Sequence, residues 1–424
     1  MGNPTTAVTP SLRMGRNLQL DILRGIAIFL VLGAHFNLPH PSGPMRVLAE
    51  FWQNHGFLGV DLFFVLSGFL IGGLLISEHT KYGRVNVMRF LIRRGLKIYP
   101  LYFIFLGYLI LFPTFKATLD NGDPLGVLMA GMGAYWPNFL FLHTYVGTNP
   151  AGHTWSLANE EHFYILLPLL IGMLAANGRM RWIIAACILS LPLFIVIRTA
   201  SMHFNDPYAE KMVASHLRLD ALFFGVGIRA VAEYHPKLFS DMRRWRFALV
   251  FCGLLLWLPA VFRHELGRIY GSVGFTITML GSGAFLIAIL HIQAADFGRW
   301  ERVVNPLARL VAMVGVYSYA IYLFHVTAIR ISERLFAGRI YTHFGGATDT
   351  AWLLAALTLS SVAIMAGIMA SRLIEWPVIR LRDKLFPPPS VSLPATCGDD
   401  TYSSRNPLHD GRLIQQDMRG ANQS

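Results

Sequence analysis

Apolar residues fill most of the sequence in long blocks, and short polar segments separate these blocks. The blocks are roughly 17–25 residues long, the length that a helix needs to cross a bilayer about 30 Å thick. We expect ten of them to be membrane-spanning helices, at about 20–38, 57–77, 90–112, 155–175, 182–198, 214–232, 247–263, 269–291, 310–331 and 351–373. The pattern predicts an all-α polytopic membrane protein, with about ten transmembrane helices around a central cavity.

The segment 125–146 is the main ambiguity in this pattern. It is apolar, but three glycines and Pro137 interrupt it, so it is either an eleventh crossing or a re-entrant segment. With ten crossings and the N-terminus inside, most Lys and Arg residues between the spans face the cytoplasm, as the positive-inside rule expects. An eleventh crossing would reverse this bias. The sequence therefore favours a multi-pass protein of a bacterial inner (cytoplasmic) membrane, with both termini cytoplasmic.

The composition agrees with a membrane protein. Of the 424 residues, 14% are charged, whereas soluble domains carry about 25% charged residues. The net charge of +12 lies between apolar blocks, which favours membrane lipids over nucleic acid as partners. The three scattered cysteines give neither a disulfide framework nor zinc spacing, and we expect no metal. We expect three regions: a cytoplasmic tail at 1–19, a transmembrane domain at 20–385, and a disordered cytoplasmic tail at 386–424.

Ionisable residues inside the spans form an inner and an outer layer. Each costs a few kcal/mol at the bilayer centre, so it needs a partner or a function. In the first span, His35 lies eleven residues after Arg24, about 16 Å and about three turns along a helix, so both line one stripe. At the inner end of the third span, Arg93, Arg94 and Lys97 would join Arg24 in a cationic pocket for the phosphates of a nucleotide-bearing donor. Packing of a buried histidine and snorkelling of the cations to lipid headgroups are the alternatives.

The outer layer comes from other spans. Asp61 lies in the second span, and the adjacent Glu160 and Glu161 of the fourth span point about 100° apart, so that one faces the cavity and the other a neighbouring helix. The sixth and ninth spans add four candidates for binding an acceptor, Arg218, Asp220, Tyr322 and His325. Structural pairs between helices are the alternative for each of them. The two layers describe a path for a donor from the cytoplasm and an acceptor from the outer side.

Seven motifs follow one another along the chain: LDILRGIA before His35, GFLGVDLFFVLSGFLI, FLIRRGLKIYPLY, HTWSLANEEHFYILLP, RLDALFFGVGI, YSYAIYLFH and IEWP. Over residues 20–385 the sequence resembles the acyltransferase-3 family of bacterial integral-membrane acyltransferases, which includes O-antigen, Nod-factor and macrolide O-acyltransferases. The resemblance implies a ten-helix acyltransferase domain that uses cytoplasmic acyl-CoA, most often acetyl-CoA, as its donor. The acceptor would be a carbohydrate, a lipid-linked sugar or a glycosylated small molecule. Some relatives carry a fused periplasmic hydrolase-like domain, and none is expected in this sequence.

Two family elements map onto single residues of this chain. The family's Arg and His separated by ten residues correspond to Arg24 and His35, its expected catalytic pair. Its Arg-x-x-Arg element corresponds to Arg94 and Lys97, where lysine supplies a point charge in place of a two-pronged guanidinium.

Our mechanistic hypothesis makes His35 the general base that takes the proton from the acceptor hydroxyl as the oxygen attacks the thioester. An ordinary imidazole pKa of about 6.5 suits this role at neutral pH. Asp61, Glu160 or Glu161 would orient its other nitrogen, and the sequence does not choose among them. A two-step route through an acyl-imidazole stays open. The alternative function is a secondary transporter or flippase for a lipid- or sugar-like substrate, which the lack of matching repeats in the two halves disfavours.

Overall fold

The computed structural model describes residues 17–146, 150–204 and 212–387. Within these ranges the chain forms helices and no strands, so the predicted all-α class is confirmed. The predicted tails at 1–19 and 386–424 fall almost entirely outside the described residues.

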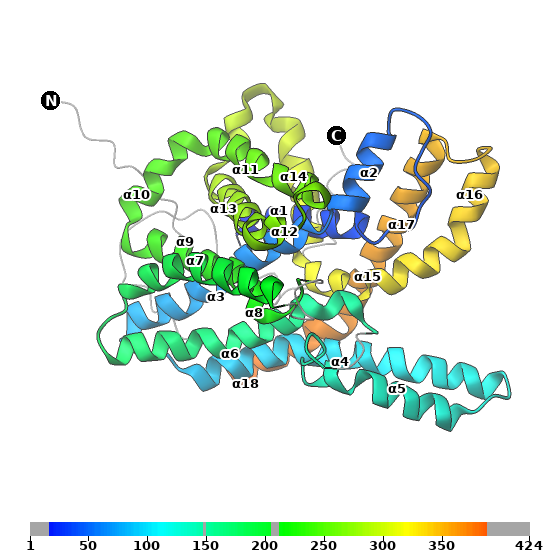
Figure 1. Ribbon diagram of the computed structural model, residues 1–424, viewed down its shortest axis with the longest axis horizontal. Coiled ribbons are helices and arrows are strands. Elements are labelled where there is room, and N and C mark those ends of the chain that lie inside the picture. Colours follow the sequence, from blue (N-terminus) through cyan, green and yellow to red (C-terminus); the bar gives the residue numbers. More distant parts are fainter. Residues whose placement is uncertain (1–16, 147–149, 205–211, 388–424) are drawn as a thin grey trace, which may run out of the picture.

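The helices follow in chain order (Figure 1). Those of the first half are α1 (Leu18–Gly33), α2 (Arg46–His55), α3 (Leu58–Tyr82), α4 (Val87–Leu119), α5 (Pro124–Phe139), α6 (Trp155–Ala176), α7 (Trp182–His203), α8 (Ser215–Arg218) and α9 (Asp220–Tyr234). Those of the second half are α10 (Pro236–Asp241), α11 (Arg246–Val261), α12 (Arg263–Ile269), α13 (Phe275–His291), α14 (Glu301–Val316), α15 (Ser318–Ser332), α16 (Gly338–His343), α17 (Asp349–Ala370) and α18 (Trp376–Leu385). Short 3-10 segments are η1 (Gly152–Thr154), η2 (Met242–Trp245) and η4 (Ala294–Trp300), and short π-helical segments are η3 (Tyr270–Gly274), η5 (Glu333–Ala337) and η6 (Ser371–Glu375).

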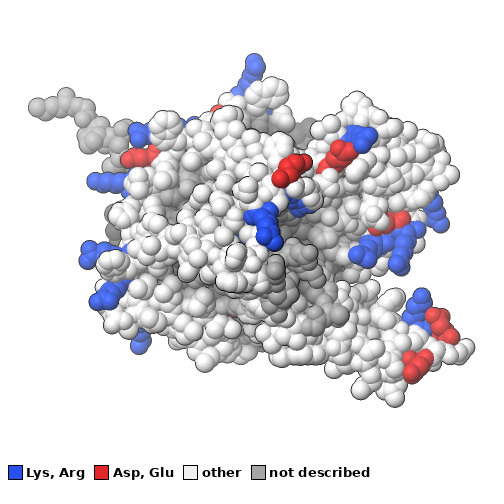
Figure 2. Space-filling model, viewed as in Figure 1, with Lys and Arg blue, Asp and Glu red and all other residues white. Residues whose placement is uncertain are grey.

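Several of these helices have the length and apolarity of membrane spans. Among the described residues there are six such segments, or seven if the bent pair around Tyr317 counts as one span: Leu58–Tyr82, Val87–Leu119, Trp182–His203, Pro236–Val261, Arg263–His291 and Asp349–Leu385, with Ala294–Val316 and Ser318–His343 as the bent pair. Figure 2 shows few charged side chains over the centre of the face in view, and most of them lie near its edges. The protein is therefore a multi-pass membrane protein. Three of the ten predicted spans are missing from this set of described segments. Helices α1, with 16 residues, and α9, with 15, are shorter than a full crossing, and α6 has 22 residues but carries the polar run 159–162 near its start.

The predicted ninth span, 310–331, is not one straight helix. The chain bends by 77° between the helical stretches that end at Val316 and begin at Ser318. The two parts have different partners, since α14 packs along α1 and α15 packs along α17. At the bend the ring of Tyr317 stacks on Trp376, with ring centroids 5.4 Å apart. A single continuous helix could not serve both packing directions, so the expectation of one straight span here was wrong.

The ambiguous segment 125–146 forms α5 and the loop after it. The α5 helix folds back along the second half of α4 (Figure 1). Its last turn lies near the middle of α4, where the Tyr102 hydroxyl donates to the Asn138 carbonyl at 3.1 Å. The first half of α4 contacts α6, where the Tyr99 hydroxyl donates to Glu161 at 2.9 Å. Because α5 has 16 residues, about 24 Å, it is shorter than the bilayer core. Helices α5 and α6 therefore lie one after the other along α4, which favours the re-entrant interpretation.

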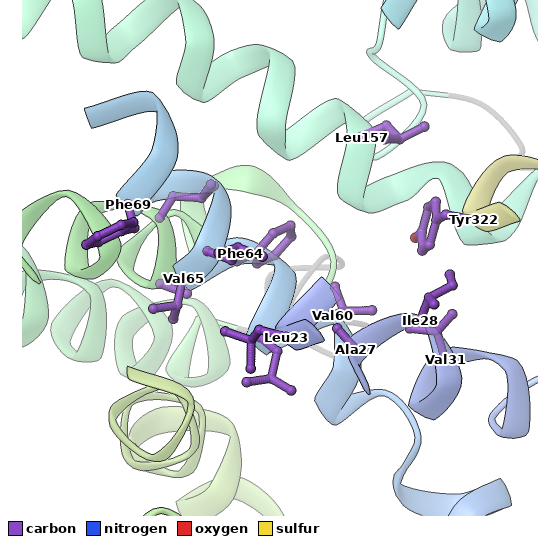
Figure 3. Close-up of a cluster of buried hydrophobic side chains, with 14 of the residues drawn as sticks. Leu23, Ala27, Ile28, Val31, Val60, Phe64, Val65, Phe69, Leu157 and Tyr322 are labelled. Carbon is purple, nitrogen blue, oxygen red and sulfur yellow. The ribbon is translucent and has the colours of Figure 1, made fainter. Parts of the chain in front are cut away.

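Helix α1 lies at the centre of the core and presents its buried face to several helices. Figure 3 shows Ala27 and Val31 of α1 close to Val60 of α3, with Tyr322 of α15 nearby. Close backbone contacts hold α3 against α9, since a Cβ atom built on Gly68 would lie 1.9 Å from the Leu222 carbonyl oxygen. Small residues of this kind allow helices in membranes to approach closely. The packing brings the predicted polar residues of α1, α4, α6 and α15 toward one region.

Candidate functional site

A cavity of about 130 Å³ lies between α1, α3, α4, α6 and α15. Its polar wall contains Arg24, Arg94, Lys97 and Glu160, and its other wall is largely apolar. The three cations come from two helices that the sequence analysis placed at the same membrane level. The structure thus brings together the inner cationic pocket that was predicted from their positions.

The charge in this cavity is only partly compensated by protein. Arg24 forms a salt bridge with Asp21 at 2.7 Å. Within the described residues, neither Arg94 nor Lys97 forms a salt bridge, and the Arg94 guanidinium instead lies 5.9 Å from the ring centroids of Phe90 and Tyr164. Glu160 in the same wall attracts both cations without forming a salt bridge to either, so the cations remain suited to an anionic ligand with several oxygen acceptors.

The two adjacent glutamates of α6 point in different directions, as the helical angle between them predicts. Glu160 lines the cavity and accepts a hydrogen bond from the Tyr164 hydroxyl at 2.7 Å. Glu161 accepts from Tyr99 of α4 and leaves its other carboxylate oxygen buried without a hydrogen bond. Glu160 is therefore the member of the pair that a ligand in the cavity could meet.

Arg93 lies away from the cavity, although the sequence placed it in the donor-binding group. Its guanidinium donates to Asp383 of α18 at 2.9 Å and to the backbone carbonyl of Phe386. Adjacent residues on a helix point about 100° apart, so Arg93 and Arg94 cannot share one partner. The structure gives Arg93 the role of fastening the C-terminal helix to α4.

Three of the predicted outer-layer residues form a buried ionic network with one arginine that the sequence analysis did not single out. Asp61 pairs with Arg218, and Asp220 pairs with Arg198 at 2.8 Å. Arg198 is fully buried and also donates to the carbonyl of Leu217 at 2.9 Å. The sequence signal that could have identified Arg198 was its position at the end of a predicted span, where an unpaired charge is costly. These contacts use Asp61, Arg218 and Asp220 as partners between helices.

We expect the replacement of Arg198 by methionine to destabilise the protein strongly. It would leave the Asp220 carboxylate buried without its ionic partner, and breaking one side of a buried pair costs about 3–5 kcal/mol. Thermal unfolding of the purified protein in detergent should show a clearly lower Tm. Replacing Arg46, whose pair with Glu50 is exposed, should leave the Tm nearly unchanged, because exposed pairs contribute little. Equal Tm values for the two variants would contradict the structural assignment.

Three histidines meet next to Tyr322, which also lines the cavity. The ring centroids of His35 and His325 are 4.6 Å apart, and His153 lies 5.3 Å from His325 and 6.5 Å from His35. They come from the end of α1, from α15 and from η1. His325 is fully buried, whereas His35 and His153 are partly exposed. The cluster therefore offers two imidazoles that a substrate could reach.

The hydrogen bonds of His35 favour one of its two neutral forms. Its Nδ1 atom lies 3.0 Å from the carbonyl oxygen of Val31. Since a carbonyl only accepts, Nδ1 carries the proton in the neutral ring, and Nε2 retains its lone pair. An imidazole in this form is ready to accept a proton.

His153 was not singled out from the sequence, although it immediately precedes the helix that carries both glutamates. Its Nε2 donates to the Leu323 carbonyl at 3.0 Å, and its own carbonyl accepts from the Tyr322 hydroxyl at 2.5 Å. Burial lowers the pKa of His153 to about 3, so it is neutral at physiological pH. The signal that could have found it was the position of a histidine beside a predicted span rich in carboxylates.

Tyr322 contacts both the cavity and the histidine cluster. Its side chain lines the cavity, its hydroxyl also hydrogen-bonds to Ser156 at 2.7 Å, and its backbone carbonyl contacts His325 at 2.5 Å. Of these two predicted residues, His325 contacts His35, and Tyr322 contacts His325. Among the described residues, the three candidate carboxylates make no hydrogen bond with His35, whose contacts are Val31 and His325.

Comparisons with known proteins identify the family of this chain. Residues 17–370 match the family described as "Acyltransferase domain". The chain is 32% identical over 330 residues to the O-acetyltransferase OatA of Staphylococcus aureus, covering 73% of this chain and 50% of the relative. It is 27% identical over 331 residues to the Bacillus subtilis protein named "Putative peptidoglycan O-acetyltransferase YrhL", covering 74% and 48%.

The chain thus spans about half the length of the curated relatives it matches. No solved structure matches it. The family match extends over most of the chain, including every helix that lines the cavity and the histidine cluster. From its motifs and this match, the chain belongs to the acyltransferase-3 family of membrane acyltransferases.

Proposed function

We propose that this protein is a membrane O-acyltransferase that moves an acyl group, in the first place acetyl, from acyl-CoA to a hydroxyl of a carbohydrate or glycosylated acceptor. The observation that carries this proposal is the cavity with the cations of Arg94 and Lys97, which form no salt bridge among the described residues, and whose lining residue Tyr322 also contacts the histidine cluster that contains His35. The names of the matched relatives, which specify O-acetylation and in one case peptidoglycan, support the reaction type.

The donor would bind with its phosphates at the inner end of the cavity. Arg94 and Lys97 would contact the phosphate oxygens, together with the half-compensated Arg24. His35 lies about 16 Å further along α1, so the long flexible arm of CoA would carry the thioester from these cations toward the histidines. The side chain of Tyr322 lines the cavity and also contacts His153, and in this proposal it would move to let the arm pass.

The chemistry at His35 would then follow from its free nitrogen. Nε2 takes the proton of the acceptor hydroxyl while the hydroxyl oxygen forms a bond to the thioester carbonyl carbon. The carbon–sulfur bond breaks as the tetrahedral intermediate collapses, and the proton on Nε2 passes to the departing thiolate. The products are the acyl ester and free CoA thiol, and His35 returns to its starting form.

The topology in this proposal has ten crossings with both termini in the cytoplasm of a bacterial cell. The shorter helices α1 and α9 and the charged helix α6 would count as spans, and α5 would be the re-entrant element. The donor would enter from the cytoplasm, and the acceptor, a surface or lipid-linked glycan, would approach the partly exposed face of His35 from the opposite side.

An assay of the purified protein in lipid nanodiscs tests this function. Acetyl-CoA with peptidoglycan fragments or other bacterial glycans should release free thiol, and mass spectrometry should show one added acetyl group on the glycan. Without a glycan, little thiol should appear. A transporter or flippase would move a substrate and release no thiol, so glycan movement without thiol release would replace the proposed function by that alternative.

A further inference from the structure

We infer that His325 is the positioning residue of His35, and that it holds the ring with Nδ1 protonated and Nε2 facing the substrate. This inference rests on the proposed function of His35. In this inference His325 orients His35. The sequence analysis had instead made His325 a candidate for binding the acceptor.

The first step is the hydrogen-bond direction at His325. Its Nδ1 atom lies 2.5 Å from the Tyr322 carbonyl oxygen. Because that oxygen only accepts, Nδ1 carries the proton, and Nε2 of the neutral ring is an acceptor.

The second step is the contact between the two rings. Nε2 of His325 lies 3.2 Å from Nδ1 of His35, and the rings meet edge to face at 83°. An acceptor on His325 therefore faces the nitrogen of His35 that the Val31 carbonyl already requires to be the donor. Two independent backbone carbonyls, one on α1 and one on α15, thus impose the same proton arrangement on the pair.

The third step is electrostatic. In the familiar catalytic triad a carboxylate orients the histidine and stabilises its charged form. Here the orienting group is a neutral imidazole with no exposure to solvent, and the groups that face the pair are the neutral His153, the positive Arg330 and backbone carbonyls. Two imidazolium ions at this distance would repel each other, so the pair accepts a single extra proton. That proton is the one that His35 takes from the acceptor and returns to the leaving thiol.

Two amide substitutions separate this role from simple packing. An asparagine amide at position 325 reaches about where Nδ1 lies, so His325→Asn can keep the Tyr322 contact but not the contact with His35. A glutamine amide reaches about where Nε2 lies, and its oxygen can accept from His35. We expect His325→Gln to retain kcat within about tenfold of the wild type, and His325→Asn to lose about a hundredfold, a part of what a general base contributes. The KM values for acetyl-CoA and for the glycan should stay nearly unchanged in both.

Several outcomes would overturn the inference. Equal kcat values for the two variants, or a faster His325→Asn variant, would show that His325 only packs against Tyr322. A raised KM for the glycan with unchanged kcat would return His325 to acceptor binding. In a His35→Ala background, His325→Asn should have no further effect on the residual rate, since it acts through the missing ring. An additional loss there would also contradict the inference.

Controls keep a folding defect and a failure of the proposed function apart from a failure of this inference. His291 is another buried histidine, at the end of α13 and outside the cluster, so His291→Asn controls for the removal of a buried ring. Monodisperse elution in size-exclusion chromatography reports folding for each variant. If the wild type transfers no acetyl group, the proposed function fails. If the wild type is active, His35→Ala is inactive, and both His325 variants match the wild type, the inference alone fails.

Discussion

Replacing His35 by alanine should lower the rate of acetyl transfer by about 10²- to 10⁴-fold, the range that a positioned general base contributes. The variant removes the Nε2 lone pair that would take the hydroxyl proton, while the donor cavity, which His35 does not line, stays intact. We therefore expect the loss in kcat, with the KM for acetyl-CoA close to that of the wild type. Thiol release by purified protein over a range of acetyl-CoA concentrations measures both quantities.

Two comparisons make this result specific to the imidazole. His40 lies in the exposed segment after α1 and contacts Gln53, so His40→Ala should behave like the wild type. Because His35 is partly exposed, free imidazole added to the His35→Ala enzyme should restore part of the rate. Normal turnover by the alanine variant would remove His35 from the chemistry altogether.

Replacing Arg94 by alanine should raise the KM for acetyl-CoA by about ten- to a hundredfold. Hydrogen bonds to charged groups contribute about 1.5–3 kcal/mol, and Arg94 is a cavity cation that forms no salt bridge among the described residues. The KM for the glycan should change much less, because the acceptor is proposed to bind beyond Tyr322. Initial rates with each substrate varied in turn provide the measurement.

The neighbouring residue supplies a matched control for this prediction. Arg93→Ala removes an identical side chain that is bound to Asp383 and the Phe386 carbonyl, away from the cavity, and should leave the donor KM unchanged. With acetyl-pantetheine, which lacks phosphates, the difference between Arg94→Ala and the wild type should disappear. A raised donor KM in Arg93→Ala but not in Arg94→Ala would move the donor site to the other face of α4.

The two glutamates of α6 show what helix geometry alone can predict about side-chain directions. A helical turn requires neighbouring side chains to diverge, and Glu160 and Glu161 do so, toward the cavity and toward Tyr99. The sequence could not say which of the two would face the cavity, because that depends on how α6 is rotated against α3 and α4. The same limit applies to Arg93 and Arg94. Helix geometry predicted that their side chains point in different directions, but it did not predict which groups each one contacts.

The bend at Tyr317 shows a second limit. Hydropathy treats 310–331 as one apolar block, and nothing in its composition marks a break. The 77° turn arises because α14 and α15 pack on different helices. A similar reason explains Arg198 of α7, whose partner Asp220 lies on another helix, α9.

By itself, the sequence determined that this chain is a helical membrane protein, and it predicted that Arg24, Arg94 and Lys97 lie at one level. It also predicted that Arg24 and His35 share a stripe of one helix, but α1 ends at Gly33 and His35 lies in the turn that follows. Those conclusions need only helical periodicity and the cost of placing a charge in lipid, and both are properties of short segments. The tertiary structure alone decided that His325 and His153, not a carboxylate, surround His35, and that Asp61 and Asp220 pair with arginines. The identity of a partner depends on which distant helices pack side by side, and one sequence carries no direct signal of that packing.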